Sequence, residues 1–183
     1  PGFTVTTDAC RAYLADGEVP DELAVQVTTA LREVEEELGR ELGAAKDPLL
    51  VSVRSGAKFS MPGMMETVLN IGLNDESVRG LAEASGDERF AWDSYRRLIQ
   101  MFGKTVLDVD GEHFSAALEA KKADRGVALD YELDVEALTE LVEEYKAIVA
   151  ERAGIDFPQD PRTQLDMATE AVFRSWNTER AHI

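Results

Sequence analysis

The chain has 183 residues, with 19 Lys or Arg against 36 Asp or Glu, so its formal net charge is −17. Because nucleic acid is bound by basic surfaces, this acidic balance argues against a nucleic-acid partner. Hydrophobic residues make up 44% and charged residues 30% of the chain, which is typical of one folded domain rather than a disordered chain. No apolar run approaches the roughly 20 residues of a membrane span, so we expect no membrane partner.

Cysteine and histidine usage argues against an internal disulfide and against a metal site. Cys10 is the single cysteine, which fits a reducing, cytoplasmic location, and we interpret it as a buried structural thiol rather than a nucleophile. His113 and His182 have no metal-ligand spacing, so we expect both at the surface and predict no metal ligands in this chain. The chain shows no signal peptide and opens on Pro-Gly without methionine, which we interpret as a piece of a larger protein.

The first part of the chain predicts one strand and two helices. Alternating residues at 3–6 favour a short strand, and Asp8 can cap a short helix that Gly17 ends. A long helix should begin at residues 20–21 and end at Gly43. Its apolar stripe consists of Leu23, Val27, Leu31, Val34, Leu38 and Leu42.

Two further strands are predicted at 49–54 and 67–71, and the rest of the chain is helical. Helices are expected at 76–85, from Asp87 to about Phe102, at 112–124 and after Asp134, followed by a helix that Asp160-Pro161 opens. The fold class is therefore α+β and mostly helical, with a small sheet of three strands. We divide the chain into a first subdomain at 1–73, a helical subdomain at 74–158, and a helix at 159–183 that returns to the first subdomain.

The loop between the second and third predicted strands has a composition that suits an anion. Arg54 stands where the strand meets the loop, and its guanidinium is a rigid fork of donors that fits phosphate oxygens. Two glycines permit positive φ and close approach of backbone N–H groups, and three hydroxyl side chains add donors. These residues are Gly56, Gly63, Ser55, Ser60 and Thr67.

The loop matches neither of the two commonest phosphate-binding patterns. No G-K-[ST] ends it, and no G-x-G-x-x-G opens a helix. Its surroundings are about neutral to slightly positive, because Lys46, Arg54 and Lys58 stand against Asp47 and Glu66, and this weakly favours an anion. A mobile hairpin loop with one surface arginine remains the alternative.

The sequence of this loop resembles that of a known protein family. V-R-S-G-A at 53–57, followed by S-M-P-G-M-M-E-T-V-L-N-I-G-L-N-D at 60–75, is similar to the nucleotide-binding domain of the pyruvate, phosphate dikinase family. The shorter pattern S-x-x-G-x-x-E-T also resembles phosphoenolpyruvate synthases. Both ends of the chain extend the similarity, through P-G-F-T-V-T-T at 1–7 and V-F-R-S-W at 172–176 with R-A at 180–181.

The resemblance implies the N-terminal part of an ATP-grasp domain with a helical insertion, ATP as ligand, and magnesium whose ligands lie outside this chain. It also implies a phosphohistidine domain in the same polypeptide and a homodimeric enzyme. Such an enzyme uses ATP and phosphate to phosphorylate a carrier histidine and then makes phosphoenolpyruvate from pyruvate. Arg54 would be the catalytic contact to the ATP phosphates. The implied nucleotide-binding residues are Arg54, Ser55, Gly56, Ser60, Gly63, Met64, Thr67 and Val68.

Two functions follow from the sequence. The first is the nucleotide-binding portion of a pyruvate, phosphate dikinase, which we expect to be inactive alone because the family's metal carboxylates, a lysine segment and the carrier histidine are absent. The second is a non-catalytic helical interaction module, in which residues 74–157 dock onto another protein. The loop motif favours the first function.

Overall fold

The computed structural model describes residues 1–56 and 65–176. The described chain is α+β and mostly helical, as the sequence predicts, with a small antiparallel sheet of two strands. In chain order its elements are α1 (Thr7–Asp16), α2 (Asp21–Leu38), β1 (Val51–Val53), β2 (Val68–Ile71), α3 (Ser77–Ser85), α4 (Glu88–Thr105), α5 (Gly111–Arg125), a 3₁₀ turn η1 (Asp130–Glu132), α6 (Val135–Ala153) and α7 (Pro161–Ser175).

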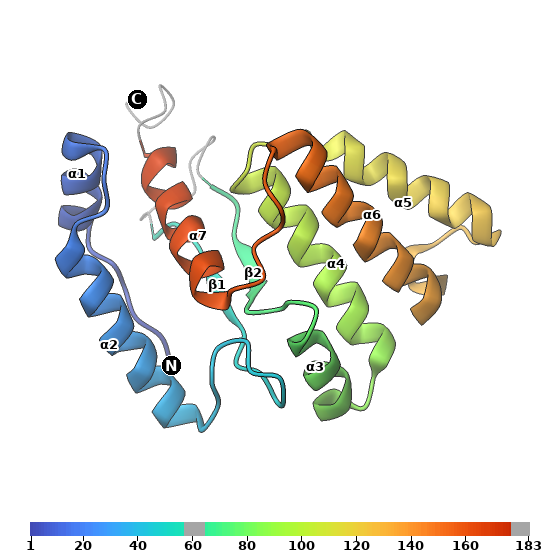
Figure 1. Ribbon diagram of the computed structural model, residues 1–183, viewed down its shortest axis with the longest axis horizontal. Coiled ribbons are helices and arrows are strands. Elements are labelled where there is room, and N and C mark those ends of the chain that lie inside the picture. Colours follow the sequence, from blue (N-terminus) through green and yellow to red (C-terminus); the bar gives the residue numbers. More distant parts are fainter. Residues whose placement is uncertain (57–64, 177–183) are drawn as a thin grey trace.

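The sheet and α7 lie at the centre, with α1 and α2 on one side and α3 to α6 on the other (Figure 1). Helix α4 packs against α3, α6 and β2, while α7 packs against α1 and both strands. One apolar core runs through these contacts from Cys10 in α1 to Phe173 in α7. The predicted division at 73 and 158 therefore falls within a continuous core. Within the described residues, no helix combines the length and apolar character that crossing a membrane demands.

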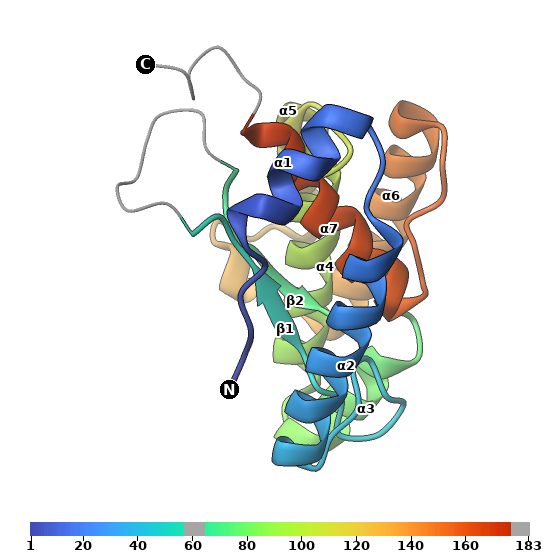
Figure 2. The same cartoon turned by 90° about the vertical axis from the view of Figure 1, so that its left-hand side faces the viewer.

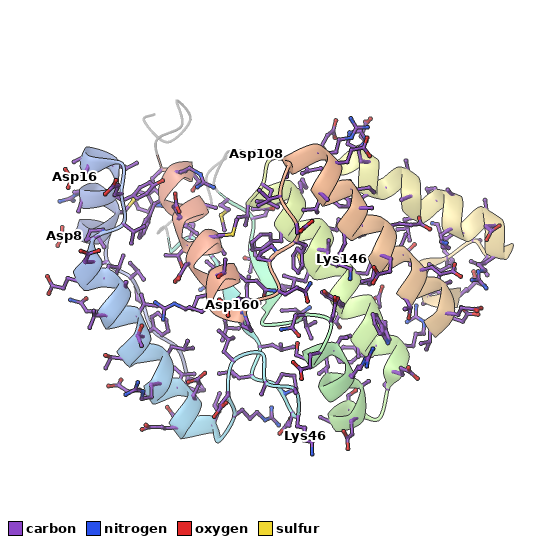
Figure 3. The ribbon with its side chains drawn as sticks, viewed as in Figure 1. Asp8, Asp16, Lys46, Asp108, Lys146 and Asp160 are labelled. Carbon is purple, nitrogen blue, oxygen red and sulfur yellow. The ribbon has the colours of Figure 1, made fainter. Side chains whose placement is uncertain are left out.

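Aspartate side chains cap the starts of four helices, and the sequence predicts three of these caps. The predicted cap by Asp8 is wrong, because α1 begins at Thr7 with Thr6 as its N-cap and Asp8 lies inside the helix. The side chains of Asp87, Asp134 and Asp160 accept hydrogen bonds from Phe90 N, Ala137 N and Thr163 N, which satisfies N–H groups that have no partner within the helix. Asp160 lies at the first turn of α7 (Figure 3). Asp110 caps α5 in the same manner, through Glu112 N.

The end of α2 differs from the prediction. The helix ends at Gly39, which adopts a left-handed φ of 64° and donates to Glu35 O, four residues before the predicted stop at Gly43. Leu42 continues the apolar spacing in the sequence, but it lies beyond the helix. There it forms an isolated β-bridge with Leu49, and Leu42 N donates to Glu35 Oε1 at 2.8 Å. Gly43 instead permits close packing, because a Cβ there would collide with the ring of Pro161.

The predicted strand at 3–6 is wrong. Thr6 has extended backbone, with φ −76° and ψ 159°, but no described strand pairs with this segment. Alternating residues therefore gave an extended backbone without the hydrogen-bonded neighbour that a strand needs. In Figure 2 the segment leads from the N-terminus to α1 and passes in front of β1.

Strands β1 and β2 pair with one extra residue in β2. Val51 pairs with Ile71 and Val53 with Val68, so one residue of β1 faces two residues of β2, which is a β-bulge. Asn70 in the bulge has a left-handed φ of 62°, a region that asparagine tolerates better than most residues. As a result Val68 and Ile71 are both fully buried while Leu69 is exposed.

A buried glutamine fastens α7 to the end of β2. Gln164 is fully buried, and its side-chain amide makes three hydrogen bonds to backbone groups. Its Oε1 accepts from Gly72 N at 2.9 Å, and its Nε2 donates to Leu73 O at 2.9 Å and Pro158 O at 2.7 Å. The side chain thereby satisfies three backbone groups that no regular element pairs.

Replacing this glutamine should destabilise the fold strongly. Gln164→Leu keeps the side-chain volume but leaves three backbone groups without partners, each costing about 1–3 kcal/mol when buried, so we expect a loss of at least about 3 kcal/mol. Urea unfolding followed by circular dichroism measures it. Gln26→Leu is the matched control, since the exposed Gln26 donates a hydrogen bond to Glu22 on its own helix. Equal losses in the two variants would contradict the role of Gln164.

Candidate functional site

The sheet brings the two ends of the candidate loop together. Val53 pairs with Val68, so Arg54, which follows β1, and Thr67, which precedes β2, stand next to each other in the antiparallel register. Both side chains are exposed. Within residues 1–56 and 65–176, no group lies in hydrogen-bond or ion-pair distance of the Arg54 guanidinium. The five donors of this side chain are therefore available to a ligand in the described structure.

A groove of about 840 Å³ lies beside Arg54. Its walls are the N-terminal segment, α1, α2, β1 and α7, and Arg54 and Gly56 are among the residues that line it. The apolar part of the lining comes from α2, β1 and α7, and also from the N-terminal segment, α1 and the residues before β1. It includes Leu31, Val34, Val51, Val53, Leu165 and Val172. The volume falls in the range of sites that hold small molecules, about 300–1,000 Å³.

Ser55 and Gly56 continue the first end of the loop. Ser55 Oγ is shielded from solvent and has no hydrogen-bond partner in the described part of the chain. Gly56 does not belong to the glycines with positive φ, so one of the two reasons for expecting a glycine there is wrong. A Cβ at Gly56 would meet nothing within 4 Å, which leaves open space for a ligand to approach the backbone.

The second end of the loop is held by residues of the helical part. Glu66 forms an ion pair with Lys104 in the last turn of α4, with 3.2 Å between Glu66 Oε2 and Lys104 Nζ. Thr67 is exposed, whereas Val68 is fully buried in the core, so only the backbone of Val68 is free to touch a ligand. Sequence reasoning expected an anchoring role for Glu66 but missed Lys104, because nothing in the sequence links residues 38 positions apart.

Three of the predicted site residues, Ser60, Gly63 and Met64, lie outside the described residues. The last letters of the C-terminal motif, at 180–181, also lie outside them. For the remaining candidates, the structure gathers Arg54, Ser55, Gly56 and Thr67 at one end of the sheet.

The donor set of the described residues suits an anion and does not suit a metal. The unpaired guanidinium of Arg54 and the open backbone at Gly56 fit phosphate oxygens. Magnesium prefers several carboxylate or water oxygens, and within the described ranges no three His, Cys, Asp or Glu side chains gather closely enough to hold a metal ion. Glu66, the carboxylate nearest in sequence, is engaged by Lys104.

Comparison with known proteins identifies the class of domain. Residues 6–183 match the family described as pyruvate phosphate dikinase, AMP/ATP-binding domain. The hairpin with its arginine at the mouth thus belongs to a nucleotide-binding domain. Since the match extends over nearly the whole chain, the chain is a member of the pyruvate phosphate dikinase AMP/ATP-binding domain family.

Individual relatives of the chain carry the same family name. The chain is 49% identical over 182 residues to the pyruvate, phosphate dikinase of Clostridium symbiosum and 51% identical over 181 residues to pyruvate, phosphate dikinase 2 of Oryza sativa subsp. japonica. It is 49% identical over 183 residues to the chloroplastic pyruvate, phosphate dikinase of Flaveria pringlei. These alignments cover 98–100% of the chain but only 19–21% of the relatives, so the chain spans about a fifth of their length.

The one cysteine lies in the wall of the groove. Cys10 is 5% exposed and its Sγ lies 4.0 Å from Phe173 O. Burial raises the pKa of the Cys10 thiol, so the reactive thiolate is depleted at neutral pH. This environment is that of a structural thiol, as the sequence analysis expects.

Thiol labelling tests this assignment. At pH 8 we expect a disulfide reagent to modify Cys10 at least about tenfold more slowly in the folded protein than in urea, because the folded thiol is shielded and poorly ionised. The Cys10→Ala variant gives the background rate, since the chain has no other cysteine. Modification of the folded protein at the unfolded rate would instead indicate an accessible, activated thiol.

Proposed function

We propose that this chain is the nucleotide-binding portion of a pyruvate, phosphate dikinase and that Arg54 binds the phosphates of ATP. One observation carries the proposal: a guanidinium with no described partner stands at the mouth of the hairpin, beside a groove of ligand size. In a chain of net charge −17, an anionic ligand needs such a local positive charge. The family of the chain supports ATP as that ligand.

The other predicted residues have supporting roles in this proposal. Ser55 and Thr67 supply hydroxyl donors from the two ends of the loop, and Gly56 lets a phosphate approach the backbone. Ser60, Gly63 and Met64 would complete the contact from within the loop. Val68 would contribute through its backbone, because its side chain is in the core.

For the longer protein we propose the reaction that names its relatives. The domain would be the N-terminal part of an ATP-grasp fold with a helical insertion, divided at 73 and 158. ATP would phosphorylate a carrier histidine of another domain in the same polypeptide, and the phosphohistidine would then yield phosphoenolpyruvate from pyruvate. Bound magnesium would neutralise the phosphates, with ligands from outside this chain. We further propose a homodimer in the cytoplasm, although the Flaveria pringlei relative is named chloroplastic.

The alternative of an independent helical interaction module has less support. Residues 74–157 lie inside the same family match as the loop, and their core is continuous with that of the sheet. The helices therefore form part of the nucleotide-binding domain that the match defines.

Substitution of Arg54 tests the proposal in the complete gene product. Hydrogen bonds to charged groups contribute about 1.5–3 kcal/mol, so Arg54→Ala should weaken ATP binding or the first phosphoryl transfer about 10- to 100-fold. Arg54→Lys should restore only part of the loss, because a point charge cannot replace a two-pronged contact. Isothermal titration and the rate of ATP-dependent histidine phosphorylation measure the two effects.

The transfer between phosphoenolpyruvate and the carrier histidine serves as the internal control, since it would take place at another domain and should not change. Arg79→Ala is the matched surface control, because Arg79 is an exposed arginine in α3, beyond the opposite end of β2. A loss of both half-reactions would mean that Arg54 holds the fold. Normal ATP binding by Arg54→Ala would reject the proposed function.

A further inference from the structure

The second end of the candidate loop is tied to a helix that the sequence does not connect with it. Lys104 Nζ donates to both oxygens of Glu66, at 3.4 Å to Oε1 and 3.2 Å to Oε2. Glu66 immediately precedes Thr67, whose side chain stands beside Arg54 at the mouth of the hairpin. The ion pair therefore fixes the backbone directly before the candidate phosphate contacts.

Lys104 is well placed for such a task because its surroundings are rigid. Its neighbour Gly103 is buried so tightly that a Cβ there would press on the ring of Phe114. The stem of Lys104 lies over Gly111 at the start of α5, with Cδ 3.5 Å from the position of a Gly111 Cβ. The lysine also lies in the last turn of α4, where the helix dipole favours a positive charge.

The pair also removes an electrostatic conflict. Glu66 would place a negative charge next to a site proposed for phosphates, in a chain that is already strongly acidic. The ammonium of Lys104 balances this carboxylate, so that it does not repel the incoming anion.

We infer that Lys104 is a positioning residue for the ATP site: it acts through Glu66, holding the second end of the loop and neutralising its carboxylate. The inference rests on the proposed function. Helix α4, in the helical part of the chain, thereby becomes part of the nucleotide-binding machinery although it contributes no contact to the ligand.

The exposure of the pair separates this role from a structural one. The side chains of Lys104 and Glu66 are 52% and 68% exposed, and exposed ion pairs add little to global stability. A variant of Lys104 should therefore fold normally and differ only in the loop and in nucleotide binding.

The experiment uses Lys104→Ala in the complete gene product, with titration of ATP. We expect the dissociation constant for ATP to rise about three- to tenfold while the urea midpoint stays unchanged. Without nucleotide, the backbone amides of Glu66 and Thr67 should exchange hydrogen faster than in the wild type. Lys104→Arg should keep wild-type affinity. The double variant Lys104→Ala/Glu66→Gln should bind no worse than Lys104→Ala, since both changes break one interaction.

Arg97→Ala is the matched control. Arg97 lies on the same helix, is 58% exposed and pairs with Asp93, so its removal deletes an equivalent surface charge away from the loop. Its affinity for ATP and the amide exchange at 66 and 67 should equal those of the wild type.

Three results would overturn the inference: unchanged ATP affinity in Lys104→Ala, an equal loss in Arg97→Ala, or additive losses in the double variant. Failure of the proposed function has a different signature. In that case the wild type does not bind ATP, or Arg54→Ala binds it normally, and the inference is rejected together with the proposal.

Discussion

The hydrogen bonds of one buried amide hold the central part of this molecule together. Gln164 in α7 joins Gly72, Leu73 and Pro158, which belong to the exit of β2 and to the connection between α6 and α7. A polar side chain in a core is tolerated only when its donors and acceptors are satisfied, and here both atoms of the amide are used. The amide thereby holds α7, which lines the groove, against the end of the sheet.

A second polar network secures the helices to the same place. Asp75, just after β2, accepts hydrogen bonds from Tyr95 of α4 at 2.7 Å and from Lys146 of α6 at 2.9 Å. Lys146 lies on the α6 side of the molecule in Figure 3. Burial raises the pKa of Tyr95 far above its ordinary value. The hydrogen bond from Gln159 lowers this pKa in part and the bond to Asp75 raises it again, so the hydroxyl remains a neutral donor to the aspartate. Helix α4 thus contacts the chain on both sides of β2: Lys104 pairs with Glu66 before the strand, and Tyr95 donates to Asp75 after it.

Local chemistry explains what could be predicted from the sequence. Aspartate caps, glycine ends and apolar stripes depend on neighbouring residues. They placed the starts of α3 to α7 within one or two residues, whereas α4 runs three residues beyond its predicted end at Phe102. The prediction failed where the outcome depends on distant partners. The segment at 3–6 has an alternating, strand-like sequence but no partner strand among the described residues. Helix α2 stops at Gly39, the first of two glycines that could end it.

The same limit applies to the site. Arg54, Ser55, Gly56 and Thr67 could be proposed from one short stretch, because the loop places them close together in sequence as well as in space. Lys104 and Gln164 could not, since each acts on residues far away along the chain. In the sequence, a lysine in a helix or a glutamine in the first turn of one looks like an ordinary surface residue. Val68 was predicted as a contact from the sequence motif. A motif does not show which face of the sheet a side chain points to, and the side chain of Val68 is buried in the core.

The bulge at Asn70 decides that side. In a regular strand, residues three apart point to opposite faces, yet Val68 and Ile71 are both in the core because the extra residue reverses the alternation between them. Every position before the bulge, Thr67 and Glu66 included, therefore takes its orientation from Asn70. Loss of this single residue during evolution would not merely shorten the strand. It would rotate the second end of the loop by half a turn, and Glu66 could then no longer reach helix α4.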